Sequence, residues 1–203
     1  MAVEQMHFTL RDLITHAWET VRNPRAGAQL VMGQNVPVEL LWQMLAVVVA
    51  LSVVLGQGAL MLVSDPEDLA GPMVLNPAIM AGLQLAVLII TVYAVHWIGR
   101  SMGCTGSFED SLALMIWLQF IMICLQVVQI GAMMIAQPLA DIIGLAGLVL
   151  FLWLLTNFVA VLHGFQSLGL VFVMILASAL GMVFLISLAL SLLGITAPGD
   201  INV

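Results

Sequence analysis

Long apolar stretches separated by short polar breaks fill the chain after about residue 40. A transmembrane helix needs about 20 apolar residues, and the pattern reaches that length five times. The expected spans are residues 40–63, 78–99, 111–136, 142–164 and 168–194. Breaker and polar residues at 137–141 and 163–167 divide the last apolar block at hairpin spacing. The pattern predicts an all-α integral membrane protein built as a five-transmembrane-helix bundle.

The first 39 residues have a different pattern, typical of an amphipathic helix. Thr9 to Asp12 resembles a capping box, and apolar residues then recur at helical spacing until Asn23-Pro24. Such a helix either lies along the inner membrane surface or packs on the cytoplasmic ends of the spans. The residues expected to define this arm are Phe8, Leu10, Arg11, Leu13, Ile14, Trp18, Arg22 and Arg25. A second short helix is expected after Pro24, with Asn35 to Pro37 capping the first span.

Charge orients the predicted bundle. The chain has 63% hydrophobic and only 7% charged residues, and its four positive charges are all arginines. Three precede the first span and Arg100 follows the second, so the positive-inside rule places residues 1–39 in the cytoplasm and the tail 195–203 outside. The net charge of −7 argues against binding to nucleic acid or to anionic lipid through a basic patch.

The third span carries polar and thioether side chains at heptad spacing, an intramembrane seam. Its members are Met115, Gln119, Met122, Gln126, Gln129 and Met133. Such residues either line a path or pocket for a ligand, or form amide hydrogen bonds to neighbouring helices. The packing interpretation is favoured. No span has an acidic or basic residue at its middle, so the sequence gives no strong sign of a proton or ion relay.

Small residues four positions apart occur in the fifth span. The pairs are Ala177 with Gly181 and Ser187 with Ser191. Pairs of this kind allow two helices to approach closely, either within the bundle or between two copies of the chain.

The predicted topology gathers polar residues at the cytoplasmic ends of spans two to four. They are His96, Arg100, Cys104, Glu109, Asp110, Asn157 and His163. Histidines, a thiol and carboxylates at one depth could bind a metal, but no zinc-binding spacing is present, and a hydrogen-bonded polar cluster is favoured. Asn157 is expected to hydrogen-bond between helices. No motif for hydrolysis or phosphate binding is found, so neither catalysis nor a cofactor is expected.

Several segments resemble the Yip1 family of five-span membrane proteins, in its bacterial form. They are Arg22 to Arg25 before the first span, Gly103 to Asp110 between the second and third, and Trp153 with the turn from Leu162 to Leu168. The resemblance implies a helical bundle at 40–194, a cytoplasmic amino-terminal segment and no established catalysis. It implies a bacterial inner membrane, where the arginine positions put the amino terminus in the cytoplasm and the carboxyl terminus in the periplasm. Third spans in the family often contain an early proline, and this one has none.

Three functions compete at this point. The leading hypothesis is a non-enzymatic scaffold, accessory subunit or organiser in the inner membrane, whose partners are the lipid bilayer and other membrane proteins or further copies of itself. The alternative is an oligomeric transporter or channel lined by the seam. The third, an intramembrane metal-dependent enzyme, requires His96, Cys104 and His163 around one point.

Overall fold

The computed structural model describes residues 9–63, 76–101 and 106–192, and these residues form seven helices. Two short helices come first and five long ones follow. The helices are α1 (Leu10–Arg22), α2 (Pro24–Met32), α3 (Val38–Val63), α4 (Pro77–Ser101), α5 (Phe108–Met133), α6 (Gln137–His163) and α7 (Leu168–Leu192).

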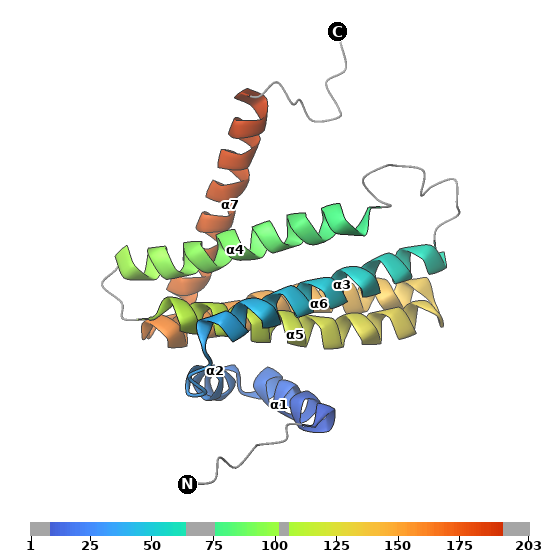
Figure 1. Cartoon of the computed structure of the whole chain (residues 1–203), viewed down its shortest axis with the longest axis horizontal. Helices are drawn as coiled ribbons and strands as arrows, with labels where there is room; N and C mark the ends of the chain where they lie inside the picture. Colours follow the sequence, from blue (N-terminus) through green and yellow to red (C-terminus); the bar gives the residue numbers. More distant parts are fainter. Residues whose placement is uncertain (1–8, 64–75, 102–105, 193–203) are drawn as a thin grey trace.

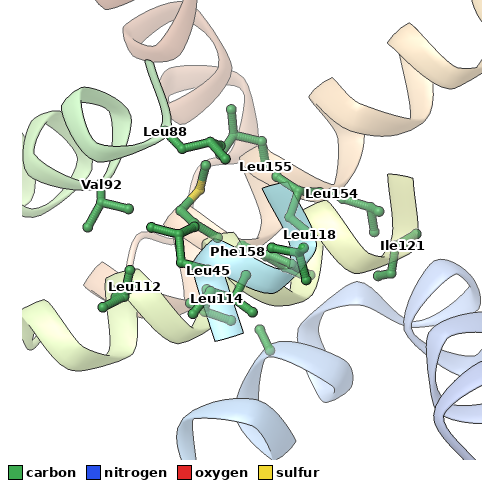
Figure 2. Packing of buried hydrophobic residues seen from close by; sticks show 14 of the residues in the cluster. Leu45, Leu88, Val92, Leu112, Leu114, Leu118, Ile121, Leu154, Leu155 and Phe158 are labelled. Carbon is green, nitrogen blue, oxygen red and sulfur yellow. The ribbon is translucent and has the colours of Figure 1, made fainter. Parts of the chain in front are cut away.

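The four helices α3 to α6 run side by side, with α1 and α2 packed beneath them (Figure 1). In their most apolar stretches α5 and α6 each have 44% of their residues buried, against 22% for α3 and 11% for α4. The centre of the bundle therefore lies between α5 and α6. Leu118, Leu154 and Phe158 meet there (Figure 2), and each is at most 2% exposed.

Four helices, α3 to α6, are long and apolar enough to cross a membrane. Helices suit such an environment because they satisfy their own backbone hydrogen bonds without water. The chain is therefore a helical membrane protein, as its composition predicts. The described apolar part of α7 covers only Leu168–Gly181, so the fifth span stays a prediction. In Figure 1, α7 crosses the bundle steeply and extends away from it.

The amino-terminal arm, α1 and α2, begins as predicted. The Thr9 hydroxyl accepts a hydrogen bond from the Asp12 amide, and the Asp12 carboxylate accepts one from the Thr9 amide at 3.0 Å. Asn23 then caps α2, with Pro24 in its first turn, where a missing N–H costs nothing. The predicted change of helix at Asn23-Pro24 is confirmed.

One polar contact fixes the arm on the bundle. The indole N–H of Trp117 on α5 donates to the Thr20 hydroxyl at 3.1 Å, and Thr20 is only 3% exposed. Gly27 on α2 lies directly against Thr20, with no room for a side chain. Of the two placements expected for the arm, the structure has it packed against α5 and α6.

Several boundaries differ from the sequence-based expectation, and α5 covers Phe108–Met133 where 111–136 was expected. The fourth span was expected from residue 142, but α6 begins at Gln137, because Pro138 occupies its first turn and starts the helix instead of breaking it. Asn35 was expected to cap the first span. Asn35 instead has φ of 46°, and its side-chain amide donates a hydrogen bond to the Gly33 carbonyl at 3.2 Å.

The contact between Gly27 and Thr20 predicts that Gly27→Ala loosens the arm. A Cβ at residue 27 would overlap the Thr20 side chain, and relieving such an overlap costs about 1 to 3 kcal/mol. Limited digestion with trypsin should therefore cleave after Arg22 and Arg25 about fivefold faster or more. Gly58→Ala is the control, since a Cβ there meets nothing within 4 Å. Equal cleavage rates in the two variants would contradict this role of Gly27.

Asp12 makes the first turn of α1 sensitive to acid. Hydrogen bonds from the Thr9 hydroxyl and amide hold the pKa of Asp12 below its usual 3.8. Because the folded-state pKa is lowered, the stabilisation is present above pH 3.8 and is lost as pH falls through the lowered pKa. Hydrogen exchange, corrected for its intrinsic rate, should show the Thr9 amide losing protection at the acid end. In Asp12→Asn the protection should not change with pH over that range.

Candidate functional site

The outer face of α1 carries an apolar row that the bundle leaves uncovered. Leu10, Ile14 and Trp18 are spaced four residues apart and are 75%, 57% and 64% exposed. We call these three residues the arm ridge. They lie on one face of the helix because residues i, i+4 and i+8 are neighbours along it. Phe8, also expected there, lies outside the described residues.

The remaining arm residues have other surroundings. Arg11, Arg22 and Arg25 are exposed. Leu13 turns away from the ridge and lines an apolar groove of about 270 Å³ between the arm, α3 and α5, together with Trp117. The arm therefore has one face on the bundle and one apolar face free of contact with the described part of the chain.

The predicted polar cluster is only partly assembled. Phe108, at the start of α5, packs its ring 5.9 Å from that of His96 and 5.1 Å from that of Tyr93. Ser107 caps α5 by accepting a hydrogen bond from the Asp110 amide at 2.9 Å, and its hydroxyl donates to the Asp110 carboxylate at 2.7 Å. Arg100 and Glu109 are exposed. The side chains of His96 and Asp110 are therefore used in aromatic packing and at the start of α5.

His163 and Asn157, both on α6, are buried members of the cluster. The Asn157 amide donates to the Trp153 carbonyl of its own helix at 2.8 Å, where a bond to another helix had been expected. His163 does reach a neighbour, because its Nε2 lies 3.0 Å from the Val95 carbonyl of α4. Gly99 permits this approach, since a Cβ there would overlap the imidazole ring.

The residues suggested for a metal do not come together in the part of the chain that can be assessed. No three His, Cys, Asp or Glu side chains among the described residues are placed to hold an ion. Cys104 lies outside those residues, so the set of His96, Cys104 and His163 stays a hypothesis.

The intramembrane seam contributes hydrogen bonds between helices. Gln126 donates to the Ser52 carbonyl of α3 at 3.2 Å, and Gln84 of α4 donates to the Ser52 hydroxyl at 3.2 Å. Gln129 donates to the Ala140 carbonyl of α6 at 3.2 Å. These are the contacts that the packing interpretation requires, and they occupy the amides that the channel hypothesis would use. Met115 is buried, whereas Gln119, Met122 and Met133 are partly exposed.

The small pairs of α7 have no helix against them in the described structure. Ala177, Gly181 and Ser187 are exposed, and a Cβ on Gly181 would meet no described atom within 4 Å. Ser191 lies where side chains are not described. Close packing through these pairs, within the bundle or between copies, stays a prediction.

Sequence reasoning missed the residues that join separate elements. Thr20, Gly27 and Trp117 fix the arm, and Ser52 joins α3 to α4 and α5. One signal was present for Trp117, because an indole N–H inside an apolar helix needs an acceptor. Nothing in the sequence named Thr20, 97 positions away, as that acceptor.

The helical bundle places this chain among membrane proteins with several spans. Residues 18–189 match the family model of the Yip1 domain, and the chain belongs to the Yip1 family. The match begins at Trp18 near the end of α1 and reaches into α7. No curated protein and no solved structure matches the chain.

The hydrogen bonds of Gln126 predict that Gln126→Leu weakens the bundle. Polar contacts between membrane helices contribute about 0.6 to 2 kcal/mol, and the substitution removes those to Ser52. Unfolding in detergent should show a loss of that size, and a double-mutant cycle with Ser52→Ala should show coupling. Gln137→Leu is the control, because Gln137 is exposed and its amide bonds Asp141 within α6. A Gln126 variant as stable as the control would rule out this contribution.

Proposed function

We propose that the protein is a non-enzymatic membrane scaffold or accessory subunit, which binds another membrane protein through the arm ridge. The observation that carries the proposal is the arrangement of α1. Its buried residues Ala17 and Thr20 hold it on the bundle, while Leu10, Ile14 and Trp18 stay exposed. A helix held on one face with an apolar opposite face is a preformed docking surface.

The charges beside the ridge favour a protein partner over lipid. Arg11 and Arg22 share α1 with Asp12 and Glu19, so the helix offers both signs of charge. Attachment to anionic lipid requires an excess of basic residues, which the chain lacks. Mixed charges around an exposed tryptophan are typical of a protein interface, where Trp often supplies a large share of the binding energy.

The fixed position of the arm also supports a scaffold. The Trp117 to Thr20 hydrogen bond joins α1 to α5, and the contact at Gly27 holds α1 against α2, which packs on α5 and α6. A partner bound there gains a defined orientation relative to the bundle, and little conformational entropy is lost when it binds. Under the positive-inside rule, Arg11, Arg22 and Arg25 put this surface at the cytoplasmic side of an inner membrane. The partner would therefore bind the arm ridge from the cytoplasmic side.

The transporter alternative gains no comparable observation. Gln126 and Gln129 of the seam are hydrogen-bonded to α3 and α6, so these amides do not face an open path. The scaffold hypothesis uses surfaces that are exposed, whereas the channel hypothesis would need these packed residues to separate.

Trp18→Ala tests the proposal. The wild-type protein should form a crosslink to a protein partner in native membranes and keep this partner in gentle detergent. We expect the amount of crosslinked partner to fall at least tenfold in the variant, as it does for a residue that dominates an interface. Trp97→Ala is the matched control, since Trp97 is 73% exposed on α4, away from the arm. Mass spectrometry of the crosslinked bands gives the readout.

Two results would contradict the proposal. One is a wild-type protein that forms no protein crosslink and runs as a lone monomer under gentle conditions. The other is equal loss of the partner in the Trp18 and Trp97 variants, which would mean that the arm ridge has no special role.

A further inference from the structure

The apolar groove between the arm, α3 and α5 is a second surface beside the arm ridge. We call it the arm groove. Its volume of about 270 Å³ is just below the roughly 300 Å³ at which small-molecule sites begin. Its lining is mostly apolar, and Leu41 and Ile116 within it are at most 4% exposed. The groove therefore has the size for apolar side chains of a partner rather than for a whole small molecule.

The wall of the arm groove on α5 is held in place before any partner binds. Trp117 lines the groove, its indole N–H donates to the Thr20 hydroxyl at 3.1 Å, and its ring stacks on Phe120 with the centroids 5.4 Å apart. The Thr20 hydroxyl in turn donates to the His16 carbonyl at 2.8 Å. A side chain that enters a preformed pocket costs little conformational entropy in the protein that provides it.

Acidic residues flank the arm groove on two helices. Residues three or four positions apart are neighbours on one face of a helix, and four acidic residues stand in that relation to a lining residue. The lining residues concerned are His16 on α1 and Ala113 on α5. The four acidic residues, which we call the acidic rim, are Asp12, Glu19, Glu109 and Asp110. None of the four arginines of the chain, all of which lie in described helices, holds such a position.

The acidic rim gives the arm groove a negative edge. Glu19 and Glu109 are exposed, and hydrogen bonds from the Thr9 hydroxyl and amide hold the pKa of Asp12 below its usual 3.8, so that Asp12 is charged at neutral pH. A negative edge repels the anionic headgroups of a cytoplasmic leaflet and attracts positively charged groups. The groove therefore suits an apolar anchor that has positive charges beside it.

We propose that the arm groove binds a basic segment that flanks a transmembrane span of another membrane protein. An apolar side chain of that segment enters the groove, and its Lys or Arg side chains lie against the acidic rim. The inference rests on the proposed scaffold function, because it names the chemistry of the partner that the arm binds.

The expected position of the groove supports a partner of this kind. Under the positive-inside rule the arm lies at the cytoplasmic side, where the spans of other membrane proteins carry an excess of Lys and Arg. The arm of a second copy is a poorer match, because its α1 carries Asp12 and Glu19 together with Arg11 and Arg22. A different protein with a basic flank therefore fits the acidic rim better.

Two synthetic helical peptides test the proposal on the full chain in nanodiscs of zwitterionic lipid. One carries photoactivatable leucines one helical turn apart, flanked by lysines, and in the other the lysines are replaced by glutamates. We expect the lysine peptide to label residues 30–44 and 109–117 about tenfold more than the glutamate peptide, because like charges at an interface are costly. Raising the salt concentration to about 1 M should reduce this difference, since salt screens exposed charges.

Variants locate the bound peptide. Gln34→Trp puts a large ring at the groove and should reduce labelling by the lysine peptide about tenfold, as expected when one apolar side chain loses its buried site. Gln43→Trp is the matched control, because Gln43 is exposed on α3 and does not line the groove. Glu19→Gln and Glu109→Gln should each reduce labelling about twofold, the size typical of an exposed ion pair. Asp141→Asn, at the start of α6, should leave it unchanged.

Four results would overturn the proposal. They are no labelling by the lysine peptide, equal labelling by the two peptides, equal labelling of Gln34→Trp and Gln43→Trp, and labelling that neither Glu19→Gln nor Glu109→Gln reduces. The scaffold function fails on a different result, a wild-type protein without a crosslinked partner in native membranes. A crosslinked partner that is lost in Trp18→Ala but retained in Gln34→Trp would exclude the groove and leave the scaffold function in place.

Discussion

Hydrogen bonds from α5 hold the described bundle together. In a bilayer, lipid chains solvate apolar side chains about as well as another helix does, so polar contacts and close approaches decide which helices pack. α5 contributes Trp117 to the arm, Gln126 to α3 and Gln129 to α6. Each contact lies on a different neighbour. The arm, α3 and α6 therefore take their positions from one helix, and α4 joins them through Gln84 and Ser52.

The same constraint accounts for the position of α7. Its Ser178 hydroxyl bonds within α7, so this polar group contributes nothing to packing on the bundle. Its direction is set by the turn after α6, where Gly164 has φ of 70° and the Phe165 amide donates to the Ala160 carbonyl. A turn in the left-handed region ends α6 sharply. α7 then leaves the bundle at a steep angle (Figure 1). An apolar cleft lies between α7, α4 and α6.

Local features could be predicted from the sequence, and contacts between distant elements could not. The capping box at Thr9 and the change of helix at Pro24 follow from short-range rules and are present. The expected start of α6 was wrong because Pro138 was taken as a helix breaker. Proline breaks the interior of a helix but is favourable in its first turn. The uniformly apolar spans carry almost no signal for which face meets which neighbour. Pairs such as Thr20 with Trp117 therefore emerged only from the fold.

The arm and α4 both contact α6. Residues 154–160 of α6 are all buried, α2 packs on this helix, and its last residue His163 lies against α4. A segment packed on every side moves as a unit, since a well-packed interior deforms little.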